Sequence, residues 1–146
     1  MRALLIEDNK VVSDSIRTML VPEEYEVDTV AFGEYGLATA KRGGHDVIIL
    51  DLMLPDIDGH DVLCRMRREG VESPILILTG LEEAENKARC LDNGADDFLT
   101  KPLDRKEFLS RLDGLTQGGR EAVSPSNDGG RLAVNFDTNT FLMMYR

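Results

Sequence analysis

Five polar side chains in this sequence come at or just after the ends of short apolar segments. They are Glu7, Asp8, Asp51, Thr79 and Lys101. Three carboxylates brought together would repel one another unless a cation joined them, and oxygen ligands favour a hard ion such as Mg²⁺. One carboxylate could also act as a nucleophile and form an aspartyl-phosphate. A lysine and a threonine hydroxyl would then bind the phosphoryl oxygens, so the set suits phosphoryl transfer to Asp51.

The apolar segments before these side chains have the pattern of strands buried on both faces of a parallel sheet. Three are strong, at Ala3–Ile6, Val47–Leu50 and Ile75–Leu78, and two are weaker, at Tyr25–Ala31 and Ala95–Leu99. Stretches with helical spacing separate them, near residues 11–20, 35–40, 62–66, 82–93 and 103–115. The alternation predicts a doubly wound, five-stranded parallel α/β sheet with five helices. Such sheets bind ligands at the carboxyl ends of their strands, where the five side chains lie.

Each of the five side chains, taken alone, has a simpler explanation. An acidic residue often ends a strand because it faces water, a threonine often caps the next turn, and a lysine is usually solvated. Chance explains poorly why three acids, a hydroxyl and a lysine share one edge. We therefore interpret them as one site.

Composition narrows the class of protein. The chain has 146 residues, with 17 basic and 27 acidic side chains and a net charge of −10. This acidic balance argues against a nucleic-acid-binding domain and against docking on anionic lipid, because both normally require a basic face. No apolar run approaches the ~20 residues of a membrane span, and no signal peptide is apparent. Cys64 and Cys90 lack metal-ligand spacing, so we expect reduced thiols in a cytoplasmic protein.

The charge also suggests where domains begin and end. Residues 119–146 are neutral, so the whole net charge lies in residues 1–118. We expect a domain over 1–118, a glycine- and serine-containing linker over 119–130, and a hairpin or a disordered tail over 131–146.

Four segments resemble the receiver domain of two-component response regulators, in particular its winged-helix (OmpR/PhoB-like) subgroup. They are Leu4–Asp8, Ile49–Gly59, Ile77–Gly80 and Gly94–Pro102. The resemblance covers residues 1 to about 116. It implies a flavodoxin-like sheet with strand order 2-1-3-4-5, in which the first and third strands are neighbours. That order would place Glu7 and Asp8 beside Asp51.

The resemblance implies a metal and phosphoryl site. Asp51 would be the phosphoacceptor. Mg²⁺ would bind Asp8, Asp51 and the backbone carbonyl of Met53, and Glu7 would reach the ion mainly through water. The donor would be a histidine kinase or a phosphotransfer protein. Because Met53 and Leu81 cannot orient an attacking water, self-dephosphorylation is predicted to be slow.

The resemblance also implies a switch. Thr79 and Lys101 would hold the phosphoryl group, and Lys101–Pro102 would be a cis peptide. Phosphorylation would pull Thr79 inward, and Phe98, at the position of the switch aromatic residue, would follow. The change would alter the face formed by residues 82–93, 95–99 and 103–115. Phe98 could instead be an ordinary apolar strand residue.

A set of charged residues resembles the dimer face of the winged-helix subgroup. They are Lys87, Asp96, Asp97, Glu107 and Arg111. The resemblance implies Lys87–Glu107 and Asp97–Arg111 pairs across a twofold axis of a homodimer. Ordinary solvated charge is the alternative, because exposed pairs contribute little stability.

The segment from Gly130 to Phe141 resembles the first strands of a winged-helix effector. A complete effector has a helix that enters the major groove of DNA. We expect either a piece of a longer transcriptional regulator that binds DNA in its full-length form, or a stand-alone signalling or protein-binding receiver without a DNA-binding output, which is either switched by phosphorylation or independent of it.

Two other classes fit the residues less well. A hydrolase with an aspartate nucleophile needs a carboxylate two residues further on, where this chain has Met53. A flavodoxin-like cofactor binder needs a glycine- or hydroxyl-rich phosphate loop after the first strand, where this chain is acidic. We therefore predict no enzyme activity beyond self-phosphorylation and slow self-dephosphorylation at Asp51. His45 and His60 are predicted to be exposed loop residues.

Overall fold

Strands and helices alternate along the part of the chain that the computed structural model describes, residues 1–80 and 84–118. The strands are β1 (Arg2–Ile6), β2 (Glu26–Val30), β3 (Val47–Leu50), β4 (Ile75–Thr79) and β5 (Asp97–Thr100). The helices are α1 (Lys10–Leu20), α2 (Gly33–Arg42), α3 (Gly59–Arg68), α4 (Ala84–Asp92) and α5 (Arg105–Asp113), with short helical turns η1 (Val21–Glu23) and η2 (Gly114–Gly118). The predicted linker over 119–130, the predicted hairpin over 131–146 and Leu81 lie outside the described residues.

The five strands form one parallel sheet in the order β2-β1-β3-β4-β5, as predicted. In the register of β1 and β3, Ile6 lies opposite Leu50. Glu7 and Asp51 are the residues that follow these two strands, so they leave neighbouring strands at the same level of the sheet. The sheet positions the carboxylates before any side-chain contact is considered.

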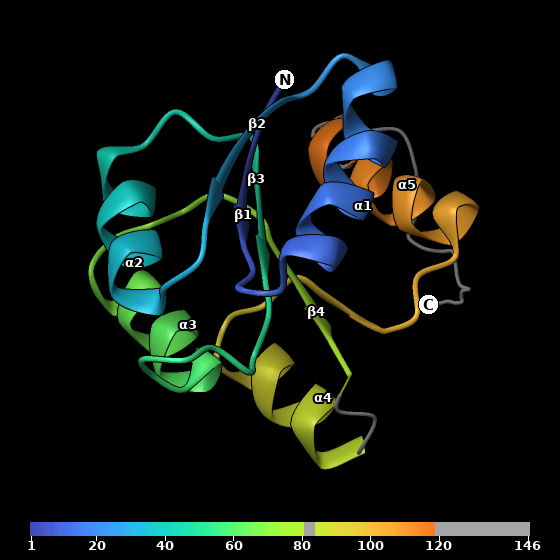
Figure 1. Ribbon diagram of the computed structural model, residues 1–146. Helices are drawn as coiled ribbons and strands as arrows, with labels where there is room; N and C mark the ends of the chain where they lie inside the picture. Colours follow the sequence, from blue (N-terminus) through green and yellow to red (C-terminus); the bar gives the residue numbers. More distant parts are fainter. Residues whose placement is uncertain (81–83, 119–146) are drawn as a thin grey trace, which may run out of the picture. The chain divides into compact units, whose positions relative to one another are not determined.

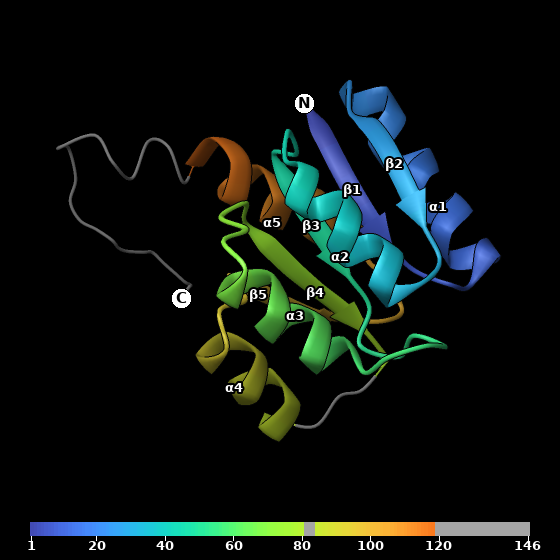
Figure 2. The ribbon, with the colours of Figure 1, turned by 90° about the vertical axis from the view of Figure 1, so that its left-hand side faces the viewer.

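Helices cover both faces of the sheet. In Figure 1, α1 and α5 lie on one side of the strands, and α2 and α3 on the other. Figure 2 shows α2 and α3 in front of the strands. The β1, β3 and β4 side chains are almost wholly buried, as strands covered on both faces require. Residues 1–112 form one compact unit.

Short polar residues begin the helices near the site. Asn9 accepts a hydrogen bond from Val12 N at the start of α1 (3.1 Å), and Asp58 accepts one from His60 N at the start of α3 (2.9 Å). Helix α2 has no cap of its own. Asp56, from the β3–α3 loop, instead accepts hydrogen bonds from Gly33 N (2.8 Å) and Glu34 N (3.0 Å). The loop that follows the predicted phosphoacceptor is thereby fixed to α2.

Arg67 fixes the opposite end of the sheet. Its guanidinium donates to the carbonyl oxygens of Gly94 (2.9 Å), Val71 (2.8 Å) and Ser73 (2.9 Å). It also pairs with Asp96 (2.9 Å). One planar group with five donors thus joins the end of α3 to the turns that precede β4 and β5.

The prediction that both histidines are exposed loop residues is wrong. His45 lies in the loop before β3 but is buried, because its Nε2 atom is 3.0 Å from Asp28 Oδ2 on β2. His60 is in the first turn of α3 and is buried against α4, with Nε2 3.3 Å from Asn86 Oδ1 and Nδ1 3.7 Å from Cys90 Sγ. In both cases the ring contacts a side chain that is distant in the sequence.

Two further expectations concern the cysteines and the membrane. Both cysteines are free thiols, as predicted, and Cys90 is buried. Burial raises the pKa of Cys90 to about 11, so its thiol stays protonated. None of the helices in residues 1–80 and 84–118 has the length and apolar character that a membrane crossing requires.

Candidate functional site

The three predicted carboxylates meet at the carboxyl end of the sheet. Glu7, Asp8 and Asp51 each offer an oxygen atom, and these atoms all lie within 4.8 Å of one another. Glu7 and Asp51 are buried, with exposed fractions of 4% and 5%, and Asp8 is exposed. Two carboxylates are therefore shielded from water, while the third opens to it.

Lys101 completes the cluster, as predicted. Its Nζ atom lies 2.8 Å from Glu7 Oε1 and 3.1 Å from Asp51 Oδ2. The Lys101–Pro102 peptide is cis, and Lys101 N donates to Thr79 O (2.8 Å), which holds the end of β5 beside the end of β4. A single ammonium group thus bridges the residues after β1 and β3.

The charges of the cluster are unbalanced. Burial raises the pKa of Glu7, and the charge of Asp51 adds to the rise, against the lowering effect of the hydrogen bond from Lys101. Burial would lower the pKa of Lys101, but its hydrogen bond to Glu7 and the charges of Glu7 and Asp51 raise it instead. One lysine faces three carboxylates, so the cluster has a negative net charge that favours the binding of a further cation.

The β3–α3 loop holds the remaining oxygen of Asp51. Met53 N donates to Asp51 Oδ1 (3.2 Å), and the Met53 side chain points to solvent, with an exposed fraction of 61%. The loop closes on itself where Gly59 N donates to Leu52 O (2.9 Å). A Cβ atom on Gly59 would lie only 2.4 Å from Leu52 Cα and 2.7 Å from Asp51 O, so only glycine allows this approach.

The two predicted switch residues are buried. Thr79, the last residue of β4, is fully buried, and Phe98 in β5 has an exposed fraction of only 6%. The Phe98 ring belongs to the same apolar cluster as Cys90 of α4 and Met66 of α3. The ring thus already lies inside the domain.

The predicted dimer residues make contacts within one chain. Arg111 pairs with Asp97 (2.6 Å) and with Glu107 (3.3 Å), and Asp96 binds Arg67 and accepts from Ile75 N. Lys87 is exposed on α4. The Asp97–Arg111 pair that the family resemblance implied between two copies is thus formed inside this one.

The donor set fits a divalent metal ion. Three carboxylates offer oxygen ligands alone, from one buried cluster with an exposed side. Hard oxygen donors suit Mg²⁺, which binds through one or two carboxylates and keeps several waters. Zinc and copper prefer nitrogen or sulfur donors, which this cluster lacks.

The sequence comparisons agree with this geometry. Residues 3–113 match the sequence model of the family described as "Response regulator receiver domain". The chain belongs to this family. It is also similar to the cell cycle response regulator CtrA of Brucella ovis and of Brucella abortus, with 40% identity over 140 residues. That match covers 96% of this chain but only 60% of CtrA, so the chain spans about 60% of the length of these relatives.

Solved receiver structures have the same fold. The Francisella response regulator 1452 receiver domain has a TM-score of 0.76 at 30% identity, over 81% of this chain and 98% of that one. The receiver domain of a sensor histidine kinase from Pseudomonas aeruginosa PAO1 has a TM-score of 0.73 at 32% identity, over 79% and 96% of the two chains. The latter has a magnesium ion coordinated in its active-site cleft.

The apolar segments of the sequence indicate the residues at the strand ends but not the residues that position them. Neither Asp56, which fixes the loop after Asp51 to α2, nor the hydrogen bonds of Arg67 were predicted. The proximity of Asp56 to the Asp-Gly pair at 58–59 was an available signal for a capping residue. Nothing local marks Arg67, because two of its four partners, Gly94 and Asp96, lie in the turn before β5 and are distant in the sequence.

Proposed function

We propose that this receiver is a phosphorylation-activated switch that accepts a phosphoryl group on Asp51 with the help of Mg²⁺. The cluster of Glu7, Asp8 and Asp51 around Lys101 Nζ carries the proposal. A bound Mg²⁺ would neutralise phosphoryl oxygens and would be held by Asp8, Asp51 and the Met53 carbonyl, with Glu7 acting mainly through water. A histidine kinase or a phosphotransfer protein would be the donor.

The transfer is a substitution at phosphorus. A carboxylate oxygen of Asp51 attacks, a new O–P bond forms, and the bond from phosphorus to the donor's imidazole nitrogen breaks. The nitrogen keeps the electron pair and takes a proton. Lys101, already 3.1 Å from Asp51, stabilises the charge that develops on the phosphoryl oxygens, and the Thr79 hydroxyl binds one of them.

The switch needs contacts with the phosphoryl group that differ between two states. Thr79 is the group we assign to this role, since it ends the strand beside β3. We also assign Phe98 to the switch. Because its ring is already buried, we expect phosphorylation to change its packing against α4 rather than to carry it from solvent to core.

The output is proposed to be transcriptional in a longer form of the protein. Similarity to CtrA supports this, although the match covers 60% of that protein. A receiver dimer through α4, β5 and α5 would use Lys87, Asp96 and the Asp97–Arg111 region. Formation of a dimer then requires Arg111 to exchange or share its partner Asp97.

The decisive experiment is the intact mass of the chain incubated with acetyl phosphate. We expect a gain of one phosphoryl group with Mg²⁺ and no gain with a chelator. Asp51→Asn should not be labelled. The matched control Asp92→Asn changes an exposed aspartate of α4 and should be labelled like the natural chain.

The outcomes separate the alternatives. Equal labelling of Asp51→Asn would show that Asp51 is not the acceptor. Absence of labelling with acetyl phosphate and with phosphotransfer donors would identify a receiver that works without phosphorylation. Labelling followed by size-exclusion chromatography with light scattering tests the dimer, which should form only after phosphorylation.

A further inference from the structure

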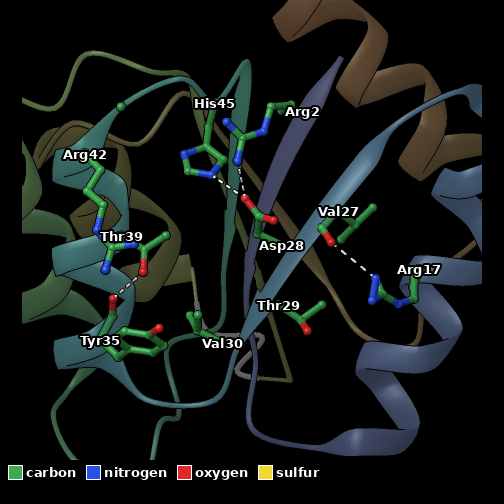
Figure 3. A pocket seen from close by; sticks show the side chains of 11 residues that line it. Arg2, Arg17, Val27, Asp28, Thr29, Val30, Tyr35, Thr39, Arg42 and His45 are labelled. Carbon is green, nitrogen blue, oxygen red and sulfur yellow. Dashed lines mark hydrogen bonds and ion pairs between the residues drawn. The ribbon is translucent and has the colours of Figure 1, made fainter.

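A second concavity runs along the edge strand β2, and Glu7, Asp8, Asp51, Thr79 and Lys101 are not among the residues that line it. It has a volume of about 590 Å³ and runs between β2, α2 and the end of α1. Small-molecule sites typically have volumes of ~300–1,000 Å³. Figure 3 shows Tyr35, Thr39 and Arg42 along α2 on one side of β2 and Arg17 of α1 on the other. We call this concavity the β2 groove.

The charges that line the β2 groove do not cancel. Its lining includes three arginines but only one carboxylate, Asp28. Asp28 is already bound by Arg2 (2.6 Å) and His45 (3.0 Å). Arg42 has no ion pair or hydrogen bond within residues 1–80 and 84–118. In a chain with a net charge of −10, this groove is therefore locally basic.

The backbone of β2 adds donors to the same place. Glu26 N donates to Met1 O (2.8 Å), and Val30 O accepts from Glu7 N (3.0 Å), so alternate residues face β1. The N–H groups of Val27 and Thr29 consequently point to the open edge. Arg17 lies across that edge and donates to Val27 O (3.2 Å). An added peptide strand would have to displace Arg17, which favours a small ligand over strand addition.

One end of the groove contains a buried polar atom without a partner. His45 has an exposed fraction of 8%, and its Nδ1 atom has no hydrogen-bond partner in the described residues. Figure 3 shows Nε2 directed at Asp28 and the other ring nitrogen on the opposite side, toward α2. Buried nitrogen atoms are nearly always hydrogen-bonded, so an unpaired one indicates a place for a further polar group.

The groove also offers an aromatic surface. Tyr35 has an exposed fraction of 56%, and the hydroxyl of Thr39, one turn further along α2, is directed back to Tyr35 O (2.8 Å). Tyr35 and Arg42 lie two turns apart on α2 and line the same groove, so together they suit a ligand that carries a flat group at one end and an anionic group at the other.

We propose that the β2 groove binds a small organic phosphate, of the size and chemistry of a nucleoside monophosphate. The phosphate group contacts Arg42, with Arg17 as a second charge from across the strand edge. The flat ring lies on Tyr35. The site is separate from Asp51 and does not depend on the proposed phosphorylation.

The test is an NMR titration of the ¹⁵N-labelled chain at fixed ionic strength without Mg²⁺, so that phosphate is not drawn to Asp51. The probes are AMP, GMP and inorganic phosphate. We expect saturable shifts of the amides of residues 27–30 and 35–45. Inorganic phosphate should bind the same residues more weakly, because it lacks the ring.

Variants separate the contributions of the two groups. Arg42→Gln should raise the Kd of all three probes about tenfold, because it removes a charge-assisted contact with phosphate. Tyr35→Leu should weaken the binding of AMP and GMP but leave the binding of inorganic phosphate unchanged. A loss of fold would weaken the binding of all three. Arg89→Gln, an exposed arginine of α4, is the matched control and should bind like the natural chain.

Three results would overturn the proposal. One is the absence of saturation up to about 10 mM probe. Another is shifts spread over the surface that are equal in Arg42→Gln and Arg89→Gln, which indicate screening of charge alone. The third is binding of an extended glutamate-rich peptide, but of no nucleotide, to residues 27–30, which would make this edge a peptide-docking surface instead.

Discussion

Replacement of Gly59 by alanine tests the close approach that positions Asp51. The added Cβ atom would meet Leu52 Cα at 2.4 Å, Asp51 O at 2.7 Å and Leu52 O at 2.8 Å. All three are backbone atoms, so no flexible side chain can move aside. Overpacking of this kind costs about 1–3 kcal/mol, and the loop that carries Asp51 must shift to relieve it.

We expect Gly59→Ala to lower the free energy of unfolding by about 2 kcal/mol, a change of roughly thirtyfold in the folding equilibrium. For a domain of this size, that corresponds to a melting temperature lower by about 8 °C. Urea unfolding followed by circular dichroism measures the first quantity. The rate of labelling by acetyl phosphate should fall as well, because the Asp51 carbonyl is one of the atoms displaced.

Gly114→Ala is the matched control, since nothing lies within 4 Å of a Cβ atom there. It should leave the labelling rate unchanged and the stability equal or slightly higher, because alanine restricts the unfolded chain. If Gly59→Ala were as stable as the natural chain and labelled at the same rate, the tight contact between α3 and the phosphoacceptor loop would not exist in solution.

Four further predictions follow from single side chains. Arg67→Lys should lower the free energy of unfolding by about 2–3 kcal/mol, nearly as much as Arg67→Met, because an ammonium group cannot reach the same set of acceptors. Equal stability of Arg67→Lys and the natural chain in urea unfolding would contradict this. Mg²⁺ at about 100 times its Kd should raise the unfolding free energy by about 2.7 kcal/mol, and Asp8→Asn should lose most of this gain in the same assay. The hydrogen bond with His45, together with Arg2, lowers the pKa of Asp28 below its ordinary 3.8, so the stabilisation it provides is present above pH 3.8 and is lost as the pH falls through the lower folded value. Solvent screening keeps this contribution small, because the Asp28 side chain is 45% exposed. The unfolding free energies of Asp28→Asn and the natural chain should differ at pH 7 and converge once the pH falls below the folded pKa, and a constant difference would refute the assignment. Phosphorylated Asp51 should persist for minutes or longer, followed by intact mass, whereas Met53→Asn should shorten its life; a half-life of seconds in the natural chain would show that a water is oriented without Met53.

The sheet and the centre of the site were predictable because their signals are local. Each buried strand is a short apolar run, and the residue that follows it is delivered to the carboxyl edge by connectivity alone. Asp51 could therefore be identified from Val47–Leu50 and its position in the chain. The cluster with Lys101 required only that four such strand ends share one edge.

The errors and omissions concern contacts between distant segments. His45 and His60 stand in polar surroundings in the sequence, and nothing adjacent shows that Asp28 or Cys90 will cover them. The same reason explains the pairing of Arg111. The family resemblance placed its partner Asp97 on a second copy, whereas the structure pairs Arg111 of α5 with Asp97 of β5 in the same chain.

The clamp at Arg67 limits which parts of the domain can move. It joins the end of α3 to the turn before β4 and to the turn at Gly94, between α4 and β5, both at the end of the sheet opposite Asp51. If phosphorylation of Asp51 displaces Thr79, we expect these contacts to hold the C-terminal turn of α4 in place. The helix would then pivot about that turn, with the largest shift at its N-terminal end and the smallest at Gly94.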